Sequence, residues 1–110
     1  MDITRGDVVL AVGPVEHANG PRPFVVVQSD VFNGAHASFS LCPITSFVDG
    51  NHLFRVPLSL DGDTGLDRDS EVQIDKIQSF RRTRILRVLG AVPLNAMTQV
   101  DDALRRWLQL

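Results

Sequence analysis

The chain has 110 residues, of which 44% are hydrophobic, and its formal net charge is −2. This length suits one domain, 1-110, and no apolar run approaches the roughly 18 to 20 residues of a membrane-spanning helix. The N-terminus lacks the apolar core of a signal peptide, and a single cysteine, Cys42, excludes an internal disulfide and a cysteine-built metal site. We therefore expect a cytoplasmic protein, and the net charge argues against a nonspecific nucleic-acid binder.

The charges are unevenly distributed along the chain. Residues 61–71 contain five acids and one cation, Arg68, whereas residues 81–87 contain four arginines and no acid. Ten of the eleven cations are arginine, whose planar guanidinium suits bidentate contact with phosphate or carboxylate. The arginine run is therefore either a solvated surface or a contact surface for an anionic ligand.

Short apolar runs separated by turn residues fill the first 92 positions and predict β-strands. In chain order, the predicted strands cover residues 7–12, 24–27, 38–44, 53–58, 71–77 and 85–92. The runs at 53–58 and 71–77 alternate between apolar and polar residues, as strands with one buried face do. Many short strands with Gly, Pro and Asp turns predict a mainly β protein with a small barrel or sandwich.

The apolar period changes to that of a helix after Pro93. Apolar residues then recur at spacings of three and four, at Leu94, Met97, Val100, Leu104, Trp107 and Leu108. Proline suits the entry to a helix, because its missing N–H would have no intrahelical partner there. The apolar stripe either packs on the sheet or forms a groove for a partner, and packing is the usual role of such a stripe.

Polar groups stand at the ends of two predicted strands that follow one another in the chain. Arg22 lies between two prolines just before one strand, and Thr45 and Ser46 follow the next. Prolines on both sides restrict the backbone and hold the arginine at the strand entrance. If the two strands pair, the guanidinium and the two hydroxyls converge at one edge of the sheet. This is chemistry that suits a bound phosphate.

Two further residues are candidates for proton transfer. His17 lies in a long loop, residues 13–21, and is the one side chain there with a pKa near neutrality. It is either a general acid or base, or a solvated loop residue. Asp75 falls in the middle of a predicted strand, where a carboxylate needs a partner such as a neighbouring arginine. No spacing of His, Cys and carboxylates is typical of a zinc site.

Five motifs in order along the chain resemble the MazF/PemK family of toxin–antitoxin ribonucleases. They are the sequences at 5–9, 20–33, 42–46 and 69–77 and the closing pattern of Gly90, Met97, Val100, Ala103 and Leu104. The resemblance covers essentially the whole chain. It implies an α+β fold in which an SH3-like small β-barrel carries a C-terminal helix and one or two short helices, and it implies a homodimer.

The resemblance also implies an activity and roles for particular residues. The activity is cleavage of single-stranded RNA at short sequences, with no metal or other cofactor, and with inhibition by an antitoxin whose acidic tail covers the RNA groove. The resemblance places Arg22 and Thr45 at the scissile phosphate and gives acid–base roles to His17 and Asp75. The expected products are a 2′,3′-cyclic phosphate and a 5′-OH end.

The positions that surround this predicted site are candidates for substrate binding. They are Glu16, Asn19, Ser46, Gln73, Gln78, Ser79, Arg81 and Arg82. Some depart from the family pattern, since an arginine is usual at Gln78 and an acid at Arg81, and some members have an arginine at Gln73. Arg81 or Arg82 replaces the lost positive charge in our interpretation.

Two other functions remain open at the level of sequence. One is a non-enzymatic poison of DNA gyrase, as in the related CcdB toxins, where a tryptophan near the C-terminus carries the activity and Trp107 is the counterpart. The other is a domain that has lost catalysis and binds RNA or an antitoxin only. Arg22 and Thr45 favour the nuclease, because the gyrase poisons generally lack them.

Overall fold

A computed structural model describes residues 1–13 and 20–110. Its elements in chain order are β1 (Asp7–Ala11), β2 (Arg22–Val26), α1 (Asp30–Asn33), β3 (Ser38–Thr45), β4 (Arg55–Leu58), β5 (Ser70–Gln73), the 3₁₀ turn η1 (Ile74–Lys76), β6 (Gln78–Arg81), the 3₁₀ turn η2 (Arg82–Arg84), β7 (Ile85–Ala91) and α2 (Leu94–Leu108). Within the described residues, no helix has both the length and the apolarity needed to cross a membrane.

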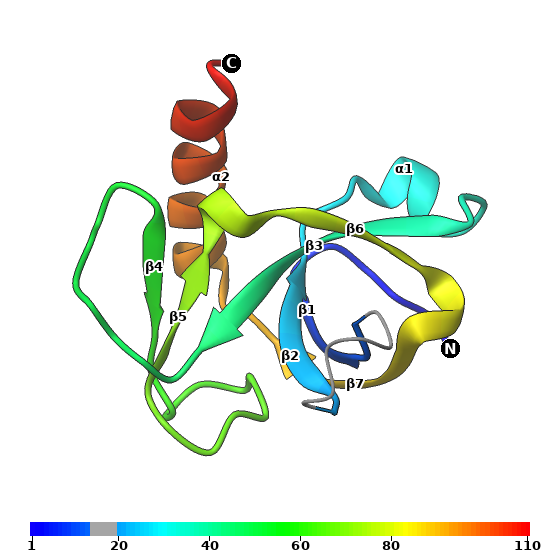
Figure 1. Ribbon diagram of the computed structural model, residues 1–110, viewed down its shortest axis with the longest axis horizontal. Helices are drawn as coiled ribbons and strands as arrows, with labels where there is room; N and C mark the ends of the chain where they lie inside the picture. The colour runs from blue at the N-terminus through cyan, green and yellow to red at the C-terminus, as the bar shows by residue number, and fades with distance from the viewer. Residues whose placement is uncertain (14–19) are drawn as a thin grey trace.

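All seven strands join one strongly curved antiparallel sheet (Figure 1). The hydrogen-bonded order is β4-β5-β3-β2-β1-β7, and β6 pairs with β3 off this path. The long strand β3 therefore organises the sheet, because it pairs with β2, with β6 through its first half and with β5 through its last two residues. The prediction of a mainly β, α+β fold with a C-terminal helix is confirmed.

Two apolar clusters occupy the two faces of the curved sheet. Successive residues of β1 and β2 alternate between them, so that Val8 and Val25 face one cluster while Val9 and Phe24 face the other. Burial on both faces explains why residues 24–27 are an unbroken apolar run. In the second cluster the rings of Phe24 and Phe80 meet edge to face, with centroids 4.7 Å apart.

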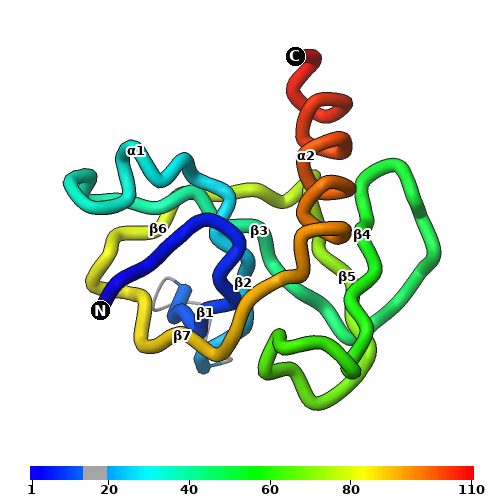
Figure 2. The backbone as a smooth tube through the Cα atoms, turned by 180° about the vertical axis from the view of Figure 1, so that it is seen from behind, coloured from blue at the N-terminus to red at the C-terminus, as the bar shows by residue number. Residues whose placement is uncertain are grey.

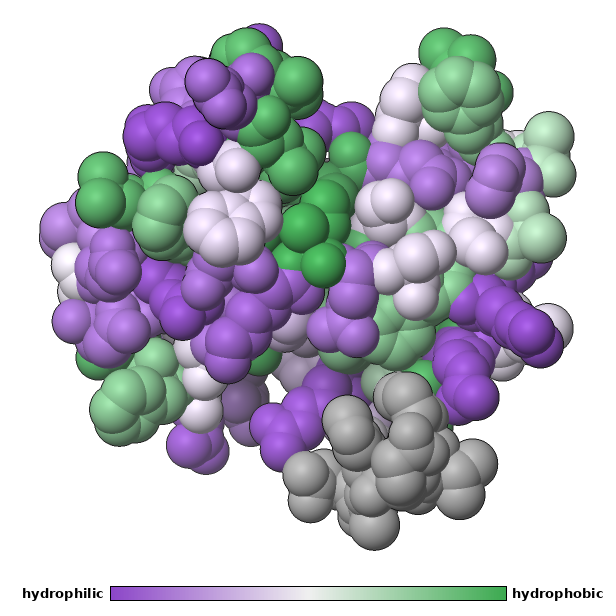
Figure 3. All heavy atoms as spheres, turned by 45° about the horizontal axis from the view of Figure 1, so that its top comes forward, coloured by the Kyte–Doolittle hydropathy of each residue, from purple (hydrophilic) through white to green (hydrophobic). Residues whose placement is uncertain are grey.

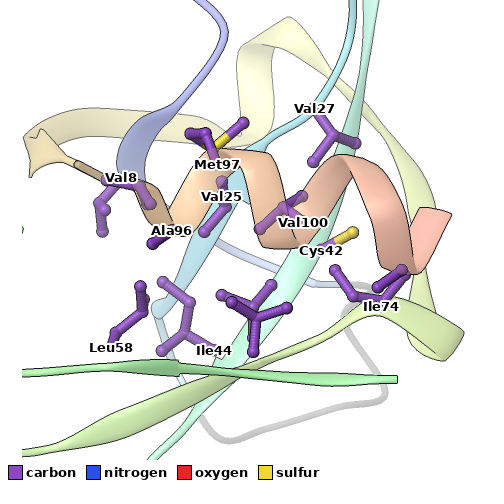
Figure 4. Packing of buried hydrophobic residues seen from close by; sticks show 14 residues of the cluster. Val8, Val25, Val27, Cys42, Ile44, Leu58, Ile74, Ala96, Met97 and Val100 are labelled. Atoms are coloured by element: carbon purple, nitrogen blue, oxygen red, sulfur yellow. The ribbon is translucent and has the colours of Figure 1, made fainter. Parts of the chain in front are cut away.

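Helix α2 covers the first cluster and lies beside β4 and β5 in both backbone views (Figures 1 and 2). Ala96, Met97 and Val100 project from it toward the strands (Figure 4). The prediction that the apolar stripe packs on the sheet is confirmed for its middle. Both ends of the stripe are open, because Leu94 is 86% exposed and Leu108 is 49% exposed.

Some predicted elements were wrong or missing. The predicted strand 71–77 ends at Gln73, and Asp75 lies in η1 rather than in a strand. The N–H of Ile74 still donates to the carbonyl of Phe54 next to β4, and the turn is then closed by a hydrogen bond of 3.2 Å from the N–H of Ile77 to the carbonyl of Ile74. Strand β6 and helix α1 were not predicted from the apolar pattern, because each contains too few apolar residues to show a period.

Candidate active site

The pairing of β2 with β3 brings Arg22 and Thr45 together. Phe24 is opposite Pro43 in this antiparallel pair, and the same register continued by two residues puts Arg22 opposite Thr45. The two side chains line one hollow of about 250 Å³, which we call the first hollow. The predicted convergence of a guanidinium and two hydroxyls at one edge of the sheet is therefore confirmed, with the second hydroxyl, that of Ser46, in an adjoining hollow that Arg22 and Thr45 also line.

Arg22 is available to an anionic ligand. It begins β2, pairs with Ala11 of β1 and is exposed to solvent. Within residues 1–13 and 20–110, no hydrogen bond or ion pair engages its side chain. Pro21 and Pro23 restrict the backbone on either side of Arg22. The position of its Cα is therefore fixed before a phosphate binds to the guanidinium.

Thr45 is half-buried at the end of β3, and its hydroxyl is oriented by the chain that follows. The hydroxyl oxygen accepts a hydrogen bond of 3.1 Å from the N–H of Phe47. The hydroxyl hydrogen remains free to be donated to a ligand, because a threonine side chain both accepts and donates. Ser46 is exposed beside it and lines a second hollow that adjoins the first.

Two glutamines form the opposite wall of the first hollow. Gln73 ends β5 and Gln78 begins β6, and both line the hollow together with the rings of Phe24 and Phe80. Amide side chains both donate and accept hydrogen bonds, which suits an unpaired base, whereas Phe24 and Phe80 are only 6% and 5% exposed and form an apolar floor. Phe24 and Phe80 were not predicted as site residues, although the alternation of β6 places Phe80 on the same face as Gln78.

The other three predicted residues of this region have different surroundings. Ser79 and Arg81 lie on the face of β6 opposite Gln78, because successive strand residues alternate. Arg82 stacks over the ring of Phe39 at 4.6 Å and donates to the carbonyl oxygen of Asn33. The structure therefore brings Gln73, Gln78 and Ser46 to the hollows, but does not bring Ser79, Arg81 or Arg82 to them.

Asp75 is held by an arginine outside the lining of the first hollow. Its Oδ1 lies 2.7 Å from Nη1 of Arg55, and the two side chains are 25% and 14% exposed. The interpretation of Asp75 as the partner of an arginine is confirmed, although that arginine is the first residue of β4 rather than a neighbour of Asp75 in sequence. A role of Asp75 in acid–base chemistry stays a prediction.

The remaining predicted residues, Glu16, His17 and Asn19, lie outside the described residues, and their roles stay predictions. Among the residues that are described, no group of three or more His, Cys, Asp and Glu side chains is arranged to hold a metal ion. Cys42 is a buried residue of β3, and burial raises the pKa of its thiol to about 12, so it is not a nucleophile at neutral pH.

Comparisons with known proteins show the family to which this chain belongs. Residues 4–108 match the family described as PemK-like, MazF-like toxins of type II toxin–antitoxin systems. Endoribonuclease MazF9 of Mycobacterium tuberculosis is 35% identical over 98 residues, which cover 84% of this chain and 82% of that protein. A probable endoribonuclease MazF of Mycolicibacterium smegmatis is 30% identical over 91% of both chains.

The solved structures extend the likeness to the whole fold. The chain superposes on a MazE–MazF crystal structure from Deinococcus radiodurans with a TM-score of 0.84, covering 100% of this chain and 99% of that chain at 24% identity. A mycobacterial endoribonuclease in complex with its cognate antitoxin gives a TM-score of 0.80 over 98% of this chain and 96% of that chain, at 19% identity. This protein belongs to the PemK-like, MazF-like family of toxins of type II toxin–antitoxin systems.

Proposed function

We propose that residues 1–110 act as one toxin domain that cleaves single-stranded RNA at short sequences, without a metal, in the cytoplasm. One observation carries the proposal: Arg22 and Thr45 face each other across two paired strand ends and line one hollow of about 250 Å³. The family and the named activity of the relatives at 30% and 35% identity support the same function.

RNA contains its own nucleophile, and this simplifies the chemistry. The 2′-oxygen attacks the adjacent phosphorus and loses its proton to a base, while the 5′-oxygen of the next nucleotide leaves and gains a proton. The products are a 2′,3′-cyclic phosphate and a free 5′-OH, and every atom and proton is accounted for. The protein must accept one proton, donate one, and stabilise the charge that develops on the phosphoryl oxygens.

Arg22 and Thr45 supply the charge stabilisation in this mechanism. A guanidinium donates two parallel hydrogen bonds to a phosphate, and the Thr45 hydroxyl donates a third. Removal of one donor to a developing oxyanion typically lowers the rate about 10²- to 10³-fold. His17 and Asp75 are the groups that we propose for the two proton transfers, each of which is typically worth about 10²- to 10⁴-fold. Gln73 and Gln78 bind a neighbouring base through their amide groups.

The test is cleavage of a long RNA by purified protein in EDTA. We expect discrete fragments with 5′-OH ends, and a rate about 10²- to 10³-fold lower in Arg22→Ala and in Thr45→Val. Arg87→Ala is the matched control, because Arg87 is also exposed but does not line either hollow. Intact RNA with trapped gyrase–DNA complexes would replace this proposal with gyrase poisoning. Intact RNA with retained antitoxin binding would indicate a binding domain without catalysis.

We propose that the protein forms a homodimer and binds an antitoxin with an acidic tail. Exposed apolar side chains support a protein partner, since Val31, Phe32, Leu108 and Leu110 are each about half exposed or more. In Figure 3, hydrophobic side chains also lie in a notch between two raised parts of the surface. An acidic tail that covers the first hollow would bind Arg22 in place of RNA. Sedimentation measures the mass of the dimer. Inhibition of RNA cleavage by a synthetic poly-glutamate peptide, which should disappear at high salt concentration, measures competition between an acidic peptide and RNA.

A further inference from the structure

A second hollow of about 220 Å³ adjoins the first across the paired strand ends. The two hollows share four lining residues, which are Arg22, Pro23, Ile44 and Thr45. The first continues toward β5 and β6, and the second continues past Ser46 to the loop before β5, where Leu66, Asp67 and Arg68 form its wall. A strand of RNA whose scissile phosphate lies between Arg22 and Thr45 would therefore extend into both hollows.

Arg68 is the one cation of this loop, and its guanidinium has no strong partner among the described residues. Its Nε lies 3.6 Å from Oδ1 of Asp67, and the two side chains are 69% and 89% exposed. An ion pair this long and this exposed contributes little, so that a phosphate can replace the carboxylate at small cost. The backbone of Arg68 is better fixed, since its carbonyl oxygen accepts a hydrogen bond of 3.1 Å from the Ser70 hydroxyl.

The loop that carries Arg68 is fastened to the sheet. The carbonyl of Asp63 accepts a hydrogen bond of 2.9 Å from the N–H of Ala91, and Thr64 is 1% exposed. Gly90 of β7 and Gly65 of the loop allow the two backbones to meet, because a Cβ on Gly65 would lie 2.4 Å from the carbonyl oxygen of Leu89. Figure 1 shows the loop, in light green, beside the end of β3. The wall of the second hollow is therefore set before any ligand binds.

We propose that Arg68, with the Ser46 hydroxyl, binds the RNA phosphate next to the scissile one. Arg22 and Thr45 then hold the scissile phosphate, and Arg68 fixes the direction in which the strand leaves it. This inference rests on the proposed nuclease function and adds a positioning residue to it. In the absence of RNA the Asp67 carboxylate lies beside the Arg68 guanidinium, and it competes with the RNA phosphate for that guanidinium.

The experiment measures the affinity of an uncleavable RNA as a function of salt. The RNA has the cleaved sequence, mapped from the products of a long RNA, with a 2′-deoxy nucleotide at the scissile position. Loss of one phosphate contact from single-stranded nucleic acid lowers the slope of log K against log salt by about 0.7. We expect this change in Arg68→Gln, together with roughly fivefold weaker binding at low salt. Arg68→Lys should restore most of the slope, and Arg87→Gln should leave it unchanged.

Two further measurements locate the contact. RNAs that lack one phosphate on the 5′ or on the 3′ side of the scissile position are compared in the wild type and in Arg68→Gln. We expect one of the two deletions to weaken binding to the wild type and to have no further effect in Arg68→Gln. Asp67→Asn should tighten RNA binding when Arg68 is present, and should have a much smaller effect when Arg68 is already replaced by Gln.

In cleavage assays, Arg68→Gln should raise KM and leave kcat nearly unchanged, because Arg68 binds substrate but does not contact the reacting atoms. An unchanged salt slope in Arg68→Gln, or equal effects of both phosphate deletions in the two proteins, would overturn the inference. That result is distinguishable from failure of the proposed function. In the first case the wild type still cleaves RNA and Arg22→Ala does not, whereas in the second the wild type itself leaves RNA intact.

Discussion

Replacement of Gly90 by alanine tests the contact that fastens the Arg68 loop to the sheet. A Cβ on Gly90 would lie 2.2 Å from the carbonyl oxygen of Asp63 and 2.6 Å from the carbonyl carbon of Thr64. These are backbone atoms, so no rotamer change relieves the clash. The loop would have to move away from β7 by about 1 Å to reach ordinary contact distance.

The expected cost follows from what this displacement breaks. The 2.9 Å hydrogen bond from the N–H of Ala91 to Asp63 is lost, at about 1 kcal/mol. Strain and poorer packing around the buried Thr64 add about 1 to 3 kcal/mol. We therefore expect Gly90→Ala to lower the free energy of unfolding by about 2 to 4 kcal/mol. The midpoint of thermal unfolding should fall by about 8 to 16 °C, since about 4 °C corresponds to 1 kcal/mol in a chain of this size.

The assay is thermal unfolding followed by circular dichroism, with all proteins at one concentration because self-association stabilises the folded state. Gly34→Ala is the matched control. Gly34 has a φ of −81°, and a Cβ there meets no atom within 4 Å. Its midpoint should equal or slightly exceed that of the wild type, because alanine restricts the unfolded chain. A midpoint for Gly90→Ala within about 2 °C of the wild type would refute the close approach of loop and strand.

Three other predictions concern single side chains. Asp75→Asn removes a partly buried ion pair with Arg55 and should lower the free energy of unfolding by about 1 to 3 kcal/mol in denaturant titrations. The acid–base role predicted for Asp75 requires the cleavage rate of Asp75→Asn to fall by about 10² or more at a temperature where the variant is folded, and a smaller change would exclude Asp75 from proton transfer. His17→Ala should remove the acidic limb of the pH–rate profile, and an unchanged limb would exclude His17 from the mechanism. The Cys42 thiol should resist iodoacetamide in the native state at pH 8. Because its folded pKa of about 12 exceeds the unfolded value of 9.0, its contribution to stability is retained below pH 9 and is lost as the pH rises from 9 toward 12, a loss absent in Cys42→Ala.

The pairing of neighbouring strands made the central pair of the site predictable from sequence. Arg22 and Thr45 stand at the ends of two successive apolar runs, and strands that follow one another in the chain usually pair. Helix α2 was predictable because its apolar period is clear and Pro93 precedes it. The wall formed by β5 and β6 was not predictable, because the turn at η1 interrupts an alternation that the sequence continues through Asp75.

Arg68 shows why the rest of the site needed a structure. In the sequence it is a single cation inside an acidic segment that has no apolar period, so the sequence pattern does not predict where its side chain lies in the fold. Its place beside Ser46 depends on a contact between two glycines and two backbones far apart in the chain, Gly65 with Leu89 and Gly90 with Asp63. Gly90→Ala should therefore lower the slope of log K for RNA against log salt by the amount that Arg68 contributes, even at a temperature where the protein is folded. The double variant Gly90→Ala with Arg68→Gln should then have the same slope as either single variant.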